Sequence, residues 1–281
     1  MNRKPLNSIT ERDILDYERD GVVCLRGMFD RDWIERVTPA VDRLMAGAAR
    51  RSREAVKDGE SGRFHVSTFG SRWDPDLMAL VMDSPAAEIS ARLMRQPEVR
   101  FFYDQLFVKE PGTKAITQWH HDLPYWPFRG DDIVSIWIAF TPVTRESSGL
   151  EYVAGSHKWG KFFKAITPDE DPAFNSDLEP CPDFSLEENR TDRTILSWSL
   201  EPGDVIAHHP LTVHGASGNA SATQRRIGLS VRYIGKDARW DPRPATMPIE
   251  GDPQLAAGDH PSKAPDIFPV VWSMPEHAAV G

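Results

Sequence analysis

Two histidines and one aspartate that lie far apart in the chain constrain its fold most strongly. His120-His121-Asp122 is followed 92 positions after the aspartate by His214, and Arg225 comes eleven positions after that histidine. Two imidazoles and one carboxylate, with open coordination positions beside them, are the ligand set of non-haem Fe(II) oxygenases. If these side chains bind one ion, distant strands must converge on it.

The spacing of the first pair suits a strand. Alternation puts His120 and Asp122 on the same face, whereas His121 points the other way. Three protein ligands would leave positions for a chelating co-substrate and for O2. The sequence therefore predicts a metal site in which His120 and Asp122 both reach the ion.

His208 and His209 compete with His214 for the role of distal ligand. His208 has the same strand parity as His214, so periodicity alone does not separate them. His214 is preferred because Gly215 follows it and because Arg225 stands in register with it.

The composition excludes several classes of protein. The 281 residues are 40% hydrophobic and 27% charged, as in an ordinary globular protein, and the net charge of −9 argues against nucleic acid as a partner. Neither a membrane helix nor a secretory signal is expected, because no long apolar run exists. Cys24 and Cys181 are expected to be free thiols in a reducing cytoplasm, and two cysteines are too few for a zinc site built on cysteines.

Residues 1–98 are predicted to be mainly helical. The run Ser8–Glu11 is typical of a capping box, so a helix is expected to reach about Arg19 and to end at Gly21. Asp30 is expected to cap a second helix, which Pro39 kinks or divides. The other elements expected here are a strand over 22–25, a mobile connector over 50–62 and a helix over 84–94.

The pattern changes to period two at Val99, where a barrel is predicted to begin. The expected strands cover residues 99–109, 116–123, 133–141, 149–153, 205–214 and 227–234. Short strands with Gly/Pro turns after a helical part predict a mainly β fold with flanking helices, a jelly-roll-type barrel with its core over 99–235. The segment 161–199 is expected to be a lid or a disordered loop, and residues 236–281 to wrap the outside of this single domain.

Arg225 is a candidate to bind the distal carboxylate of a dicarboxylic co-substrate. 2-Oxoglutarate chelates iron through its 1-carboxylate and 2-keto oxygens, which leaves the other carboxylate buried in the barrel. A planar guanidinium matches that carboxylate with two hydrogen bonds. The alternative, that Arg225 lies on the surface and the adjacent Arg226 is equivalent to it, stays open.

At these residues the chain resembles the phytanoyl-CoA dioxygenase family of Fe(II)/2-oxoglutarate oxygenases. The matching segments are 118–129, 149–158 and 203–225, and together they cover about residues 101 to 234. The resemblance implies a double-stranded β-helix, a cupin-like barrel, with iron held by His120, Asp122 and His214. It also implies that Arg225 pairs with the distal carboxylate of 2-oxoglutarate.

The resemblance adds further candidates. Trp137 and Gln105 fall where the family places residues along the co-substrate, and Lys109 is a weaker candidate of the same strand parity. The family often has a hydroxyl residue two positions after the distal histidine, where this chain has Ala216. Halogenating relatives lack the carboxylate that Asp122 supplies here, so hydroxylation, or a desaturating or ring-closing variant, is favoured.

The predicted activity is that of an Fe(II)- and 2-oxoglutarate-dependent dioxygenase. It would use O2 to oxidise a small organic substrate at a C–H bond and release succinate and CO2. Two alternatives remain: a cupin-like iron dioxygenase that does not use 2-oxoglutarate, and a non-catalytic binding protein on the same barrel. Arg129, Arg232 and Arg239 could meet a carboxylate or phosphate of the substrate. The sequence leaves open the substrate, including a coenzyme A thioester, and the oligomeric state.

Overall fold

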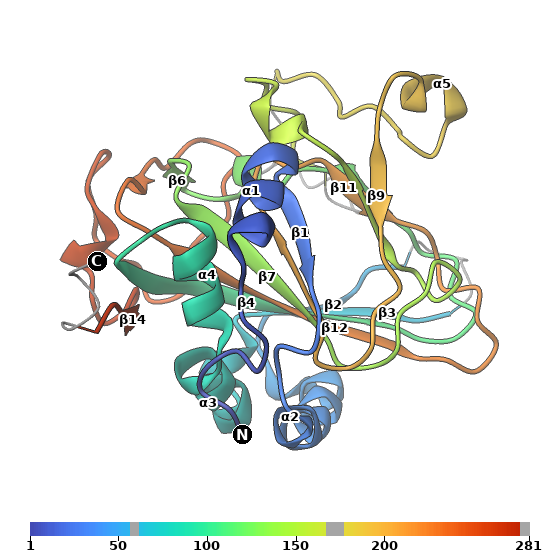
Figure 1. Cartoon of the computed structure of the whole chain (residues 1–281), viewed down its shortest axis with the longest axis horizontal. Coiled ribbons are helices and arrows are strands. Elements are labelled where there is room, and N and C mark those ends of the chain that lie inside the picture. Colours follow the sequence, from blue (N-terminus) through green and yellow to red (C-terminus); the bar gives the residue numbers. More distant parts are fainter. Residues whose placement is uncertain (57–61, 167–176, 276–281) are drawn as a thin grey trace.

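The computed structural model describes residues 1–56, 62–166 and 177–275 and has a mainly β architecture with most of its helices along one side (Figure 1). The predicted fold class is confirmed. The α-helices are α1 (Glu11–Asp20), α2 (Arg31–Arg43), α3 (Pro75–Asp83), α4 (Ala86–Leu93) and α5 (Glu187–Arg190). The strands are β1 (Val22–Leu25), β2 (Ser52–Glu54), β3 (Phe64–Thr68), β4 (Glu98–Lys109), β5 (Thr117–His120), β6 (Phe128–Arg129), β7 (Ile133–Ala139), β8 (Leu150–Val153), β9 (Ile195–Ser197), β10 (Val205–His208), β11 (His214–Ala216), β12 (Arg226–Ile234), β13 (Arg239–Trp240) and β14 (Val270–Ser273).

Two antiparallel sheets form the barrel. The larger has the order β1-β10-β7-β12-β4-β3-β2, with β14 also paired to β4, and the smaller has the order β5-β11-β8-β9. Trp137 and Ala139 of the larger sheet share an apolar cluster with Leu150 and Tyr152 of the smaller sheet. The inner faces of the two sheets therefore meet, as in the double-stranded β-helix that the resemblance implied.

The larger sheet separates a helix-covered core from the interior of the barrel. On β12, Leu229 and Val231 belong to the apolar core that α1 to α4 cover, and Figure 1 shows these helices gathered along one side of the long strands. Arg226, Ser230 and Arg232 alternate with those residues and line a cavity on the other face. Both faces of β12 are buried, and strand alternation places its polar side chains in the interior of the barrel.

The cap of α1 differs in detail from the prediction. Thr10, not Ser8, is the N-cap: its Oγ1 accepts from the backbone N of Asp13 at 3.2 Å, and the Asp13 carboxylate accepts from the backbone N of Thr10 at 2.8 Å. Gly21 ends the helix with φ 74°, as predicted, because glycine adopts the left-handed conformation at little cost. The capping box therefore begins two residues later than predicted.

Helix α2 begins as predicted, and the proline within it does not divide it. The Asp30 carboxylate accepts from the backbone N of Trp33 at 3.1 Å and caps it. Pro39 does not divide it; the helix runs to Arg43 and passes into a single π-turn over Leu44–Ala48.

Several expected connections contain regular structure. The segment 50–62, expected to be a mobile connector, holds β2, and its residues 57–61 lie outside the described part. Helix α3, which follows later in the chain, was not predicted. The segment 161–199 holds α5 and β9, and its residues 167–176 are not described. In the C-terminal part, β13 pairs with β6 and β14 with β4, while 276–281 lie outside the description.

The strand predicted over 205–214 is two strands. β10 ends at His208, the chain turns through His209 and Pro210, and β11 begins at His214 in the other sheet. Proline cannot donate to a strand ladder, which explains the interruption. His208 and His214 therefore lie in opposite sheets.

None of the helices in the described ranges is both long and apolar enough to cross a membrane.

Candidate active site

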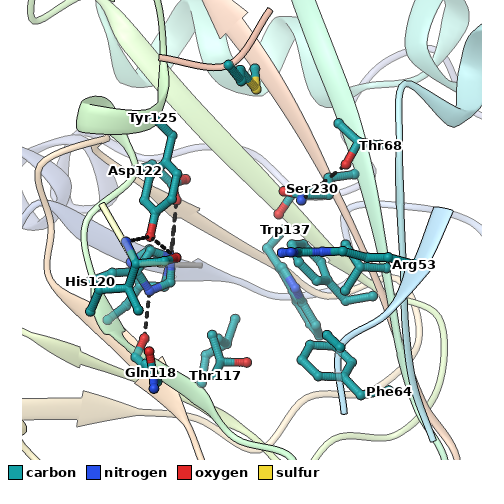
Figure 2. A pocket seen from close by; sticks show the side chains of 18 of the residues that line it. Arg53, Phe64, Thr68, Thr117, Gln118, His120, Asp122, Tyr125, Trp137 and Ser230 are labelled. Carbon is teal, nitrogen blue, oxygen red and sulfur yellow. Dashed lines mark hydrogen bonds and ion pairs between the residues drawn. The ribbon is translucent and has the colours of Figure 1, made fainter. Parts of the chain in front are cut away.

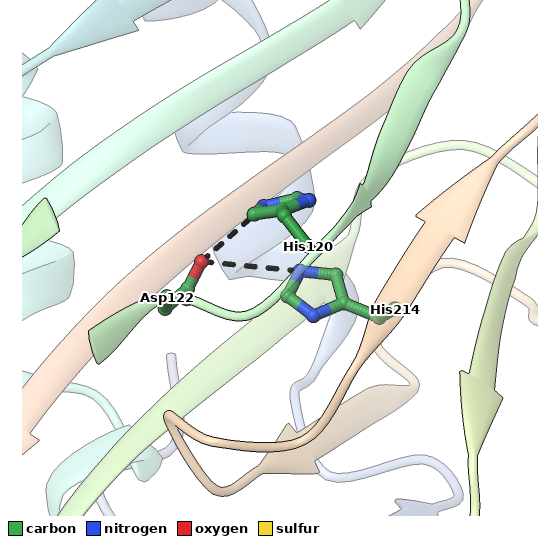
Figure 3. A group of neighbouring side chains, drawn as sticks. All are labelled: His120, Asp122 and His214. Carbon is green, nitrogen blue, oxygen red and sulfur yellow. Dashed lines mark ion pairs between the residues drawn. The ribbon is translucent and has the colours of Figure 1, made fainter. Parts of the chain in front are cut away.

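The three predicted metal ligands come together between the sheets (Figure 3). His120 is the last residue of β5 and pairs in register with His214, the first residue of β11. Asp122 lies two residues beyond β5, at the start of a helical turn rather than on the strand. One ligand atom from each residue lies within 4.8 Å of the others. Oδ1 of Asp122 is 3.5 Å from Nε2 of His120 and 3.9 Å from Nε2 of His214.

Backbone carbonyls orient both imidazoles. Nδ1 of His120 lies 2.7 Å from the carbonyl oxygen of Gln118, and Nδ1 of His214 lies 2.9 Å from that of Thr212. A carbonyl can only accept, so Nδ1 carries the proton and the lone pair of Nε2 points toward Asp122. Burial lowers the pKa of His214 well below its usual value, so the ring is neutral. Neutral, oriented imidazoles are what a divalent metal requires.

The second oxygen of Asp122 is held by polar groups of the larger sheet. Oδ2 accepts from Oγ of Ser135 at 3.2 Å and lies 3.5 Å from Nε2 of His208 and 3.6 Å from Nη2 of Arg232. Burial opposes ionisation, but the contacts with His120, His208 and Arg232 hold the pKa of Asp122 well below its usual value. The carboxylate is therefore ionised, with Oδ1 directed to the two imidazoles and Oδ2 occupied elsewhere.

His208, the competing candidate, also lies close to Asp122. Its ring centroid is 4.7 Å from that of His214, and its Nδ1 is 3.4 Å from the hydroxyl of Tyr152. Its Nε2 lies 3.5 Å from Oδ2 of Asp122, the oxygen that does not face the other two imidazoles most closely. The break in the strand at Pro210, which periodicity did not reveal, places the two histidines in different sheets.

A cavity of about 580 Å³ opens beside the three ligands (Figure 2). Trp137 and Gln105 line it, in agreement with the parity expected for them. Nε2 of Gln105 donates to Oγ1 of Thr68 at 3.3 Å. Lys109 does not line it and is fully buried, with Nζ donating to the carbonyl of Ser217 at 2.8 Å.

The structure does not bring Arg225 to this cavity. Its guanidinium points outward, with Nη2 2.7 Å from Oε1 of Glu110 and Nη1 3.1 Å from Oδ1 of Asp42. The expectation that Arg225 faces the interior is therefore not met. The reason is strand alternation, which gives adjacent residues opposite faces.

Arg226 is the arginine that enters the barrel. Its residue exposure is 2%, its Cζ lies 5.6 Å from the Trp137 ring, and its Nη2 is 3.3 Å from Oγ of Ser148. Its Nε is buried without a hydrogen-bond partner. The sequence did hold a signal for this: Ile227 and Leu229 are apolar residues of the core face, so Arg226 belongs to the opposite face.

Two buried cations thus meet in one place. Burial lowers the pKa of Arg226 to about 10, and burial together with Arg226 lowers the pKa of Lys109 well below its usual value. Both approach Oγ of Ser148, Lys109 at 3.1 Å and Arg226 at 3.3 Å. Within the described ranges neither has a carboxylate partner. Buried cations of this kind are stabilised by a bound anion.

A comparison with known families identifies the family of the chain. The family model for phytanoyl-CoA dioxygenase (PhyH) matches residues 17–227, which is 211 of the 281 residues. The chain belongs to the phytanoyl-CoA dioxygenase family. The predicted class, an iron- and 2-oxoglutarate-dependent oxygenase, is thereby confirmed.

Curated relatives are distant. A probable phytanoyl-CoA dioxygenase of Caenorhabditis elegans is 26% identical over 192 residues, which cover 66% of this chain and 59% of the worm protein. The multifunctional dioxygenase prhA of Penicillium brasilianum is 24% identical over 255 residues, covering 85% of this chain and 77% of the fungal protein. This chain therefore matches about three fifths of the length of the worm relative.

Solved structures share the fold over almost the whole chain. The non-haem α-ketoglutarate-dependent carbocyclase SnoK from nogalamycin biosynthesis superposes with a TM-score of 0.74 at 20% identity, covering 97% of this chain and 100% of SnoK. The epimerase SnoN from the same biosynthesis gives 0.69 at 22% identity, covering 95% and 97%. At these identities the similarity demonstrates the fold of the family.

Two of the three arginines suggested as substrate contacts do not line this cavity. Arg129 lies on β6, and Arg239 donates to the carbonyls of Lys236 and Ala238. Arg232 does line it, with its Cζ 4.5 Å from the Tyr103 ring and its Nη2 facing Asp122.

Proposed function

We propose that iron held by His120, Asp122 and His214 allows this chain to hydroxylate a small organic substrate, or to oxidise it otherwise at a C–H bond. The observation that carries the proposal is the approach of three ligand atoms to within 4.8 Å of one another in the wall of a cavity. When bound, Fe(II) and 2-oxoglutarate supply the activation of O2, and the co-substrate is converted to succinate and CO2.

The donor set fits a ferrous ion. Both Nε2 lone pairs and Oδ1 converge, while Ser135, His208 and Arg232 occupy Oδ2. Those three contacts favour binding through a single carboxylate oxygen, which leaves positions for the co-substrate and O2. Because the carboxylate of Asp122 takes the place that a halide would need, the proposal favours hydroxylation over halogenation.

We assign the distal carboxylate of 2-oxoglutarate to Arg226, in place of Arg225. A carboxylate there would satisfy the unpaired Nε, and it would neutralise the charge that Arg226 and Lys109 concentrate near Ser148. Trp137 supports the guanidinium with its ring face, and we propose that Trp137 and Gln105 border the carbon chain of the co-substrate.

We further propose that the segment 161–199 helps to close the cavity. Ile166 lines it, and the Tyr125 hydroxyl lies 2.6 Å from both the backbone N and the carbonyl oxygen of Ile166. Closure would exclude water and stray reductants during oxidation. Residues 167–176 of this segment lie outside the described part.

A cytoplasmic location is also proposed, because Cys24 and Cys181 are both free thiols.

The two neighbouring arginines provide a matched test. Under anaerobic conditions, Fe(II) and 2-oxoglutarate should give a metal-to-ligand charge-transfer band with the wild-type protein. Arg226→Ala should raise the dissociation constant of 2-oxoglutarate by at least about tenfold, because it removes charge-assisted hydrogen bonds. Arg225→Ala should leave it within about twofold.

Metal binding separates a specific effect from unfolding. Arg226→Ala should bind Co(II) as tightly as the wild type does, since it touches none of the three ligands. If Arg225→Ala were the variant that loses 2-oxoglutarate, the assignment to Arg226 would be wrong. If the wild-type protein gave no charge-transfer band, the proposed metal and co-substrate site would be wrong.

A further inference from the structure

Two arginines on the inward side of β12 are separated by two small residues on that side. Arg226, Ser230 and Arg232 line the cavity, and Gly228 lies under the Trp137 ring. At about 3.3 Å per residue, the six positions from Arg226 to Arg232 cover roughly 20 Å of strand. The cavity therefore has one arginine toward each end of this strand, and the small side chain of Ser230 leaves space beside Arg232.

2-Oxoglutarate is too short to span the distance between these two arginines. Its five carbons are joined by bonds of about 1.5 Å, so the molecule extends over about 6 Å. The proposed function places one end of it at Arg226 and the other end at the metal ligands. Arg232 is therefore a candidate to bind a different molecule.

Arg232 is buried, and the described residues give its guanidinium little hydrogen bonding. The residue is 3% exposed. Nη1 donates to the carbonyl of Ser230 at 3.5 Å, which is long for a hydrogen bond, and Nε is buried without a hydrogen-bond partner. A guanidinium has five N–H donors, and buried donors that find no acceptor cost free energy. These contacts therefore indicate that an acceptor from a bound molecule completes the environment of Arg232.

Two aromatic side chains hold this guanidinium in place. Its Cζ lies 4.5 Å from the Tyr103 ring and 5.8 Å from the Trp126 ring. The two rings are tied together, because Nε1 of Trp126 donates to the Tyr103 hydroxyl at 2.7 Å. Rings that cover the face of a guanidinium leave its N–H edge for an acceptor. A planar carboxylate matches such an edge with two hydrogen bonds of the strong, charge-assisted kind.

Asp122 does not saturate Arg232. Nη2 of Arg232 lies 3.6 Å from Oδ2 of Asp122, beyond the usual hydrogen-bond distance. The same oxygen accepts from Oγ of Ser135 at 3.2 Å and lies 3.5 Å from Nε2 of His208. The other oxygen of Asp122 is a proposed iron ligand, so the charge of this carboxylate is shared with the metal. Arg232 can therefore bind a second carboxylate.

We propose that the substrate is a carboxylic acid and that Arg232 binds its carboxylate group. Because Arg232 adjoins Asp122, a carboxylate held there would bring a C–H bond a short distance along the substrate to the metal ligands. The rest of the substrate would lie against Ser230, which Figure 2 shows across the cavity from His120 and Asp122. This inference rests on the proposed function, and it specifies the substrate class and a residue that determines specificity.

Two probes that differ only in their polar group test the proposal. 2-Naphthoate carries a carboxylate, and 2-naphthamide carries a neutral amide of nearly the same shape. Equilibrium dialysis measures the affinity of each for the protein loaded anaerobically with Fe(II) and saturating 2-oxoglutarate. The wild-type protein should bind the naphthoate about tenfold more tightly, because a charged donor favours a charged acceptor. Equal affinities for the two probes would overturn the proposal.

Substitutions of Arg232 locate this discrimination. Arg232→Gln should weaken binding of the naphthoate by about tenfold and leave binding of the naphthamide unchanged, since charge-assisted hydrogen bonds are lost. Arg232→Lys keeps a positive charge beside Asp122 but loses the planar fork, so it should weaken binding of the naphthoate by about fivefold. If Arg232→Gln does not bind Fe(II), Arg232→Lys decides. Wild-type affinity for the naphthoate, or equal losses for both probes, would overturn the proposal.

Arg239→Gln is the matched control. Arg239 lies on β13, outside the cavity lining, and donates to the carbonyls of Lys236 and Ala238. The substitution removes the same charge and should leave the affinity of both probes unchanged. A loss of naphthoate binding as large as that of Arg232→Gln would mean that only the net charge of the protein matters, and it would overturn the proposal.

The charge-transfer band of the same samples keeps the two claims apart. Arg232→Lys should bind 2-oxoglutarate within about twofold of the wild-type affinity, whereas a tenfold loss would assign Arg232 to the co-substrate and overturn the proposal. A normal band with naphthoate binding that does not depend on Arg232 would mean that only the carboxylic acid substrate is wrong. Absence of the band from the wild-type protein would instead contradict the proposed function.

Discussion

The indole of Trp137 lies directly on the backbone of Gly228. A Cβ atom at position 228 would stand 1.9 Å from Cζ2 of that ring, far inside any real contact distance. The two residues come from neighbouring strands, since β7 and β12 pair along most of their length. Because glycine has no side chain, the ring can lie flat between β12 and the cavity and support Arg226, whose Cζ is 5.6 Å from it.

Gly228→Ala should therefore damage co-substrate binding without touching a polar contact. The added methyl must push the indole away, and we expect a loss of about 1–3 kcal/mol in the free energy of unfolding, typical of overpacking. The affinity for 2-oxoglutarate should fall by about tenfold, because the support for Arg226 is lost. Urea unfolding and anaerobic titration of the charge-transfer band measure the two effects.

A second substitution checks the cause. Phenylalanine lacks the atom that collides, so Trp137→Phe added to Gly228→Ala should recover part of the lost stability, as a double-mutant cycle would reveal. An unchanged stability and 2-oxoglutarate affinity in Gly228→Ala would show that the ring does not need the glycine.

His208 and His214 should respond differently to removal. His214→Ala deletes a proposed ligand and should abolish stoichiometric binding of Co(II). His208→Ala removes a group that lies against Oδ2 of Asp122 but is not a proposed ligand, so Co(II) affinity should fall by about 10- to 100-fold without being lost. Calorimetric titration distinguishes the two results; equal loss of binding in both variants would make His208 a ligand.

Tyr125 should control access to the segment that follows Lys161. Its hydroxyl contacts the backbone of Ile166 at both N and O, and phenylalanine cannot do so. Tyr125→Phe should therefore speed tryptic cleavage after Lys161 and Lys164 several-fold under native conditions. A substrate analogue should slow the cleavage in the wild type, and identical rates with and without it would argue against closure.

The convergence of the three proposed metal ligands was predictable from the sequence because it depends on chemistry and spacing. His120, Asp122 and His214 converge although the prediction placed Asp122 on a strand and the structure places it in a turn. The fold was predictable for a similar reason, since period-two patterns and turn residues mark strands. Which strands join which sheet was not predictable, as the division at Pro210 demonstrates, because pairing depends on contacts distant in sequence.

The wrong prediction that Arg225, and not Arg226, faces the interior has a different cause. Spacing from His214 does not fix which face of β12 a side chain takes, because one extra residue in the preceding turn reverses every face. The burial of Leu229 and Val231 under the helices fixes it. If the inward face of β12 is inferred from its apolar residues, instead of from the spacing to His214, the sequence predicts that Arg226 faces the interior.

Two buried histidines outside the ligand set should make stability depend on pH. Nδ1 of His209 accepts from the backbone N of Leu211 at 3.1 Å, and Nε2 of His121 accepts from that of Phe163 at 2.8 Å. Neither nitrogen can accept once protonated. Burial, with neighbouring histidines, lowers the pKa of His209 to about 3 and that of His121 to about 4.

The sign follows from proton binding. Unfolded histidine titrates near pH 6.5, so between that pH and about pH 4 the unfolded chain binds more protons than the folded one. The free energy of unfolding should thus fall as pH falls through this window, by up to about 1.4 kcal/mol per pH unit for each histidine. Urea midpoints at several pH values measure the slope. His209→Asn keeps an acceptor for Leu211 but cannot titrate, so its slope should be shallower; a slope equal to that of the wild type would mean that His209 does not contribute.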